Sequence, residues 1–263
     1  MSNRTPAKIC HRKGNLVKFA KDVTVFKKEL FVMRSLDEIR ARTPKIEIFR
    51  GQIQHAMLAT LLVAGALSLL RDDGAGLLGV SALGWAKLTI AITVIHQVVV
   101  AIVFRLQLHL NIMVRLFGDR ALKVWGAVFM PMLAARPLLV LTTGLASLNT
   151  LEGDRSFQLV LGAILLIAPI WGMHSVVKHF TFSRALGGDH FFDRFANMPL
   201  VDKGIFKFFQ NGMYSFVFLG FWAIALLTGS WNALILALFQ HAYIWVHMYC
   251  TEDPDMKIIY EQA

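Results

Sequence analysis

Hydrophobic residues of this chain are concentrated in six blocks, and polar residues separate each block from the next. The blocks cover residues 53–70, 88–104, 124–148, 157–177, 213–228 and 231–249. A helix rises about 1.5 Å per residue, so about 20 apolar residues cross the roughly 30 Å hydrocarbon core of a bilayer. Lipid offers no partner for backbone N–H and C=O groups, which makes helices the default. The pattern predicts an all-α protein, a polytopic bundle of about six transmembrane helices.

Composition supports the same class of protein. Hydrophobic residues make up 56% of the 263 residues, charged residues only 17%, and the mean hydropathy is +0.55. A soluble domain of this length cannot bury so much apolar surface, so a multi-pass integral membrane protein is predicted. No short apolar core with a small-residue cleavage site precedes the first block, so no removable signal peptide is predicted.

Lysine and arginine are distributed unevenly among the polar segments. They are concentrated in residues 1–50, 105–123 and 178–212, which fall on one side of a six-helix arrangement, whereas 71–84 and 148–156 hold few. Cytoplasmic loops carry an excess of Lys and Arg, so both termini are predicted to be cytosolic. The formal net charge of +10 follows from this distribution and from attraction to anionic lipids. No nucleic-acid partner is therefore predicted.

The blocks and loops divide the chain into three parts. Residues 1–50 are expected to form a basic cytosolic segment outside the bundle, 51–177 a four-helix transmembrane scaffold, and 178–263 a C-terminal functional module. The first part fits either an amphipathic surface helix or a partly disordered tail. Cys10 and Cys250 lie far apart on the predicted reducing side, so no disulfide is expected.

The membrane compartment is less constrained by the sequence. The short, Ala- and Leu-rich chain favours a bacterial cytoplasmic membrane, with the endoplasmic reticulum as the alternative. The sequence does not indicate an oligomeric state.

Histidine spacing predicts no metal centre. Ligands on one helical face need spacings of three or four residues, whereas His174 and His179 are five apart and His241 and His247 are six apart. Neither pair places both rings on one face, so no metal cofactor is expected.

Arg136 lies beside Pro137 in the middle of the third block. A cation facing lipid there would cost about 2.5–3.5 kcal/mol on insertion scales, so the side chain is expected to face protein or a polar cavity. Arg136 is a candidate to hold a lipid phosphate or a substrate carboxylate, or it accompanies a proline kink. Tyr243, in the last block, is a second candidate to contact the substrate.

Three motifs in the last third of the chain indicate chemistry. The first is the glycine pair Gly187-Gly188, where a backbone can approach a ligand closely. The second, Gln210-Asn211-Gly212-Met213-Tyr214, precedes a helical hairpin that turns at Thr228-Gly229-Ser230. The third, Glu252-Asp253-Pro254, follows the hairpin, and Tyr260 stands six residues beyond the proline.

The order and spacing of these motifs resemble the integral-membrane methyltransferases that include phosphatidylethanolamine N-methyltransferase and isoprenylcysteine carboxyl methyltransferase. The resemblance covers roughly residues 183–260. It implies that the chain binds S-adenosylmethionine, with the following residues at the cofactor: Gly187, Gly188, Asn211, Gly212, Met213, Tyr214, Glu252 and Asp253. The family's usual Arg-His-Pro is here Gln210-Asn211-Gly212, so a cation and a ring are missing there, and the second acid is Asp253.

The chemistry of the cofactor fits these residue types. Its ribose hydroxyls and ammonium need a carboxylate, which Glu252 or Asp253 supplies. Methyl transfer requires alignment and exclusion of water rather than a covalent nucleophile. An amine acceptor must lose a proton before it attacks, and Glu252, His190 and His241 are the candidate catalytic proton acceptors.

The leading hypothesis is an S-adenosylmethionine-dependent methyltransferase acting on a membrane-embedded lipid, most simply the amine of phosphatidylethanolamine or its methylated derivatives. One alternative keeps the cofactor but changes the acceptor to a prenylated cysteine carboxylate or a thiol. The other is a noncatalytic membrane scaffold or transporter with a degenerate motif.

Overall fold

The computed structural model describes residues 33–209 and 211–260. The described residues from Arg34 onward form one compact unit. The regular elements in the described part are helices, and the nearest approach to a strand is one isolated bridge between Leu77 and Val80. The predicted all-α class is confirmed.

All six predicted hydrophobic blocks form helices. The long ones are α3 (Gln52–Leu69), α4 (Ala82–Leu110), α6 (Ala121–Ala146), α7 (Arg155–Leu165) with α8 (Ile167–Ser175), α12 (Leu219–Thr228) and α13 (Trp231–His247). Five segments of the described residues are long and apolar enough to cross a membrane, and the block at Met213–Thr228 forms a shorter apolar helix. The chain is therefore a multi-pass membrane protein.

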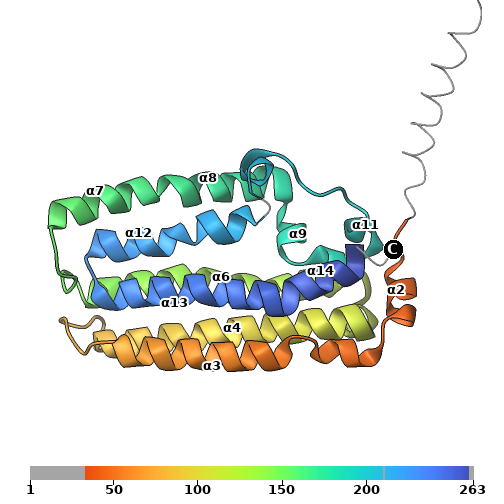
Figure 1. The fold of residues 1–263 in the computed structure, drawn as a ribbon, viewed down its shortest axis with the longest axis horizontal. Helices are drawn as coiled ribbons and strands as arrows, with labels where there is room; N and C mark the ends of the chain where they lie inside the picture. The colour runs from red at the N-terminus through yellow and green to blue at the C-terminus, as the bar shows by residue number, and fades with distance from the viewer. Residues whose placement is uncertain (1–32, 210, 261–263) are drawn as a thin grey trace, which may run out of the picture. The chain divides into compact units, whose positions relative to one another are not determined.

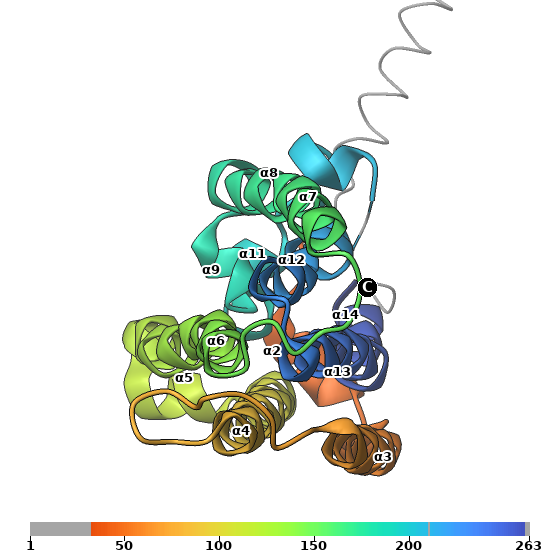
Figure 2. The ribbon, with the colours of Figure 1, turned by 90° about the vertical axis from the view of Figure 1, so that its left-hand side faces the viewer.

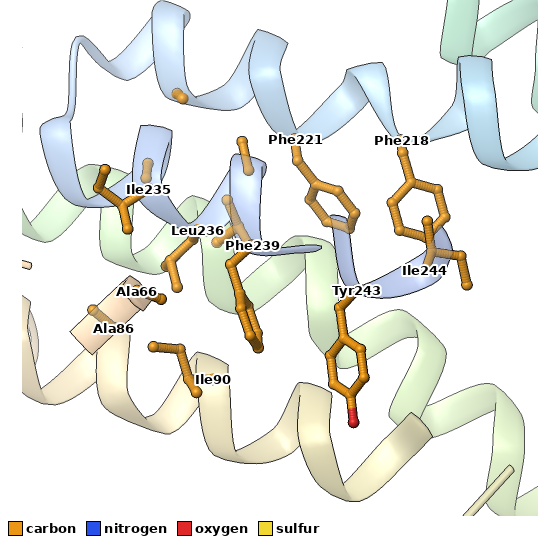
Figure 3. Close-up of a cluster of buried hydrophobic side chains, with 14 of the residues drawn as sticks. Ala66, Ala86, Ile90, Phe218, Phe221, Ile235, Leu236, Phe239, Tyr243 and Ile244 are labelled. Atoms are coloured by element: carbon orange, nitrogen blue, oxygen red, sulfur yellow. The ribbon is translucent and has the colours of Figure 1, made fainter. Parts of the chain in front are cut away.

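The long helices run side by side, with α12 lying between α7–α8 and the pair α6 and α13 (Figures 1 and 2). The main core cluster includes Ala66, Ala86, Leu236 and Phe239 and is drawn in Figure 3. Alanines on α3 and α4 let these helices approach α13 closely, since small residues bring backbones together where lipid provides no hydrophobic driving force. The core therefore lies around α13, which is the most buried of the candidate spans.

Side-chain caps set where several helices begin. Ser81, Asp154 and Ser230 accept hydrogen bonds from backbone N–H groups at the starts of α4, α7 and α13. Gly229 ends α12 in the left-handed conformation, with φ of +59°, which glycine adopts without strain. The tight hairpin predicted between the last two blocks is thus confirmed.

Short helices gather at one end of the bundle, on the right in Figure 1. They are α2 (Leu36–Arg42), η1 (Lys45–Phe49), α5 (Ile112–Phe117), η2 (Gly118–Arg120), α9 (Phe182–Ala185), α10 (Gly188–Phe191), α11 (Asp193–Ala196), η4 (Gly204–Lys207) and α14 (Asp253–Tyr260). Three π-helical turns extend the long helices: η3 (Val176–Phe180), η5 (Met213–Val217) and η6 (Met248–Glu252).

The described part of the N-terminal segment packs on the bundle. Leu36 and Ile39 of α2 form a buried cluster with Leu108, Ile258 and Ile259. Leu36 and Ile39 supply an apolar face that hydropathy averaging over a basic segment conceals. The predicted surface helix or tail within residues 1–32, including Cys10, lies outside the described residues.

Candidate functional site

Two of the three sequence motifs meet in space. The hydroxyl of Tyr214, in η5, donates a hydrogen bond to Oε2 of Glu252, in η6. The two residues stand 38 positions apart. The hairpin formed by α12 and α13 brings them to the same end of the bundle.

Both residues lie in π-helical turns. Met213–Val217 precedes α12 and Met248–Glu252 follows α13. A π turn inserts an extra residue into a helix and rotates the side chains that follow, and such turns are frequent at functional sites. Here the two turns direct the phenol and the carboxylate toward each other.

Glu252 keeps one oxygen without a close protein partner. Its Oε1 lies 3.6 Å from Nε2 of His247, which exceeds hydrogen-bonding distance, and the side chain is 24% exposed. One carboxylate oxygen is thus held by Tyr214, and the other faces His247 without a hydrogen bond from the described residues. A carboxylate in this state can accept hydrogen bonds from hydroxyl or ammonium groups of a ligand.

A buried network of charged residues lies beside this pair. Arg105 Nη1 is 2.8 Å from Asp255 Oδ1, and His190 Nε2 is 3.3 Å from Asp255 Oδ2. His190 Nδ1 lies 3.3 Å from Asp189 Oδ1, and the Tyr260 hydroxyl donates to Asp189 Oδ2 at 3.2 Å. The network joins α4, α10 and α14, so it fixes the position of the segment that carries Glu252.

Arg105 also binds the backbone. Its Nη2 donates to the carbonyl oxygens of Arg50 at 2.9 Å, Cys250 at 3.1 Å and Thr251 at 3.3 Å. The guanidinium thus binds two carbonyl groups of η6 directly before Glu252 and holds this turn against α4.

His190 is held in its charged form. Burial by itself lowers the pKa of this imidazole, but hydrogen bonds to Asp189 and Asp255 outweigh it and raise the pKa to about 10. The pKa of Asp189 is lowered, because its bonds to His190 outweigh the effect of burial. An imidazolium bonded to two carboxylates donates protons rather than accepting them. This arrangement favours an ion-pairing role for His190.

The glycine pair packs tightly against the protein. Gly187 has φ of +73°, its N–H donates to the carbonyl of Arg184 at 2.8 Å, and a Cβ there would strike the ring of Phe104. A Cβ on Gly188 would come within 2.6 Å of the carbonyl oxygen of Ser183. The pair thus allows the α9–α10 turn to sit against α4, and the structure shows no exposed cradle at Gly187.

The other candidate cofactor residues lie around the Tyr214–Glu252 pair with differing exposure. Asn211 is exposed, and its carbonyl accepts from the N–H groups that begin η5. Gly212 is buried, and a Cβ there would lie 2.9 Å from Ile205 Cγ2. Met213 packs on the cluster that contains Ile205. Asp253 pairs with Lys257 at 2.8 Å on the surface. Gln210 lies outside the described residues.

The remaining candidates lie within the bundle, away from Glu252. His241 accepts a hydrogen bond from Trp222 Nε1 at 3.0 Å and stands about three helical turns from Glu252. Arg136 is 2% exposed in α6, which continues through Pro137. Tyr243 is fully buried and makes an edge contact with His55 at 5.6 Å. The structure therefore does not bring His241, Arg136 or Tyr243 to the carboxylate.

Sequence reasoning missed Arg105, Asp255 and His247. The sequence places Arg105 among the cations of the loop 105–123, because one charge at the end of an apolar block ordinarily lies at the membrane surface. Asp255 follows the proline of the acidic motif, and that position is the one signal that could have identified it. In the described residues, no group of three or more His, Cys, Asp or Glu side chains could hold a metal ion.

Comparisons with known proteins agree with the motifs. Residues 157–263 match the family model for phospholipid methyltransferases. The chain is similar to proteins named phosphatidylethanolamine N-methyltransferase from Clavispora lusitaniae (32% identical over 108 residues), Meyerozyma guilliermondii (28% over 106) and Kluyveromyces lactis (31% over 103). These alignments cover 40%, 39% and 38% of this chain respectively, and 12% of each relative. No solved structure matches.

The matches confirm the resemblance predicted from the three motifs, which all lie in the matched part. The aligned region represents a small fraction of the relatives' own length. These relatives are eukaryotic, so the bacterial membrane that the composition favoured gains no support.

Proposed function

We propose, from the premise that residues 157–263 carry the phospholipid methyltransferase family pattern, that this chain transfers methyl groups from S-adenosylmethionine to the amine of phosphatidylethanolamine or its methylated derivatives. The observation that carries the proposal is the contact between Tyr214 and Glu252, which joins the two motifs into one site. We further propose that the protein works in an internal membrane of a eukaryotic cell, such as the endoplasmic reticulum, with both termini cytosolic.

The residues present suit this cofactor. Glu252 presents one carboxylate oxygen that no protein group binds closely, which suits the ribose hydroxyls or the ammonium. Asn211 and Lys207 are exposed, precede Tyr214 by three and seven residues in the sequence, and offer donors for the cofactor's carboxylate. The cofactor supplies an activated methyl group on its sulfonium.

The protein's own part in the reaction is positioning and proton removal. Tyr214 fixes the orientation of Glu252, and the Arg105–Asp255 pair fixes the backbone that carries it. A protonated acceptor amine must lose one proton before its lone pair can attack, and we assign this proton to the Glu252 oxygen that Tyr214 does not bind. His190 is already protonated, and His241 lies too far along the helix to share this role.

The test is transfer of labelled methyl from S-adenosylmethionine to lipid in membranes that contain the full chain. Glu252→Gln is compared with Glu152→Gln, a control in which the carboxylate is 92% exposed in the loop before α7. We expect label in methylated phosphatidylethanolamine with the wild type and the control, and none with Glu252→Gln.

Other outcomes discriminate between the alternatives. Label in prenylated cysteine or thiol products instead of lipid would show that the protein is a methyltransferase with a different acceptor. Wild-type protein that neither labels any acceptor nor binds the cofactor by calorimetry would favour a noncatalytic scaffold.

A further inference from the structure

Polar side chains gather in the interior of the bundle, away from the ends of the helices. His96 of α4, Arg136 of α6, and Gln240 and Tyr243 of α13 are each at most 2% exposed. Nε and Nη2 of Arg136 donate to Oε1 of Gln240 at 2.7 and 2.5 Å. Arg136 also interacts electrostatically with His96 and Tyr243. Figure 3 shows Tyr243 projecting from α13 toward α4 with its hydroxyl at the tip.

Most of these groups lack hydrogen-bond partners. Nε2 of Gln240, the hydroxyl of Tyr243 and both ring nitrogens of His96 are buried and have no hydrogen-bond partner among residues 33–209 and 211–260. Proteins rarely leave buried polar groups unpaired, because each pays a desolvation cost without a compensating bond. Several in one cluster, contributed by different helices, indicate a site built for a ligand.

The charge of Arg136 identifies the class of ligand. Its interactions in the described part of the chain are with an amide, a phenol, an imidazole and the rings of Phe218 and Phe221, and none is with a carboxylate. Arg105, by contrast, has Asp255 at 2.8 Å. A buried cation without a counterion is costly, and the unpartnered amide N–H groups of Gln240 are also donors. A cation among donors is the environment that an anion requires.

A row of polar residues connects this cluster to Glu252. Gln240, Tyr243 and His247 are spaced i, i+3 and i+7 along α13, so they lie on one face of the helix. Both ring nitrogens of His247 are also unpartnered, and Nε2 faces Glu252 at 3.6 Å. About 18 Å of helix separates Gln240 from Glu252. This face therefore carries polar groups from the end of the bundle to the buried cluster.

We propose that Arg136, Gln240, Tyr243 and His96 bind the anionic oxygens of the phosphodiester of a membrane phospholipid. This site is separate from the one at Glu252, because about 18 Å of helix lies between Gln240 and that carboxylate. The acyl chains then leave between the helices into the bilayer.

The experiment measures lipid binding to the full chain in detergent by native mass spectrometry, separately from methyl transfer. The probes are short-chain phosphatidylethanolamine, a diacylglycerol with the same chains but no phosphate, and inorganic phosphate as competitor. The variants are Arg136→Gln, Tyr243→Phe and the control Arg155→Gln. Arg155 is a bundle arginine at the opposite end of α12, where its guanidinium donates to the carbonyls of Leu226 and Leu227.

We expect Arg136→Gln to weaken binding of phosphatidylethanolamine on the order of tenfold to a hundredfold, as loss of charge-assisted hydrogen bonds does. Tyr243→Phe removes a hydroxyl without a protein partner, so it should weaken lipid binding about threefold to tenfold without lowering stability. Diacylglycerol and S-adenosylmethionine should bind equally well to all variants, and Arg155→Gln should bind the phospholipid as the wild type does.

Folded Arg136→Gln with wild-type affinity for phosphatidylethanolamine would overturn the proposal. If that variant does not fold, Tyr243→Phe decides, and unchanged lipid affinity in it has the same meaning. Inorganic phosphate that displaces the lipid completely would assign the site to free phosphate instead. If the lipid binding depends on Arg136 but the protein transfers no methyl group, the anion site is supported and the proposed function is refuted.

Discussion

Asp255 is expected to be the carboxylate whose charge the fold depends on most at the site end. It is fully buried and contacts two cationic groups, Arg105 at 2.8 Å and His190 at 3.3 Å. Asp255→Asn keeps the shape of the side chain and removes the charge. Arg105 then loses its nearest buried counterion, and His190 retains Asp189 alone.

The magnitude follows from the burial of the partners. Arg105 and His190 are 2% and 1% exposed, so water cannot replace the lost carboxylate. Breaking a buried ion pair from one side typically costs about 3–5 kcal/mol. Asp253→Asn is the matched control, because that carboxylate pairs with Lys257 on the surface and is 41% exposed. Its loss should cost at most about 0.5 kcal/mol.

The assay is denaturant-induced unfolding in detergent micelles, followed by fluorescence of the 6 tryptophans. Asp255→Asn should cost less in an Arg105→Met background, as the double variant, than in the wild type, because no guanidinium is then left without its counterion. A loss below about 1 kcal/mol for Asp255→Asn, or a double variant as unstable as the sum of its single changes, would refute the reasoning.

Three further outcomes are expected. The pKa of His190 is raised from 6.5 to about 10, so its stabilisation is complete below pH 6.5 and is lost as the pH rises through 10. The unfolding midpoint should fall over that range in the wild type and change less in His190→Gln. Gly187→Ala should cost about 2 kcal/mol or more in the same assay, from the positive φ and the clash with Phe104, and wild-type stability would contradict this. Tyr214→Phe should lower methyl transfer about tenfold by freeing Glu252, and an unchanged kcat/KM would exclude that positioning role.

The fold follows largely from hydropathy, because lipid forces backbone groups to pair within each helix. The limits of α4 show where that reasoning ends. The block predicted at 88–104 became Ala82–Leu110, whose last turns bury Arg105, Gln107 and His109. A hydropathy profile places the end of a span at such polar residues, because it does not include the hydrogen-bond and ion-pair partners that other helices provide.

The candidate site divides in the same way. Tyr214 and Glu252 were identifiable from motif order alone, because a tight hairpin returns the chain to the side it left. The glycine pair was also identifiable, but its packing against Phe104 was not.

Sequence by itself determined the class of this protein, the number of its hydrophobic segments and the two motifs that contain Tyr214 and Glu252. Only the tertiary structure decided which charges meet. Arg105 pairs with Asp255, whereas Arg136 binds Gln240 and contacts no carboxylate among the described residues. The physical reason is that burial and pairing are properties of residues distant in sequence, whereas a helix needs only its own backbone and a lipid environment.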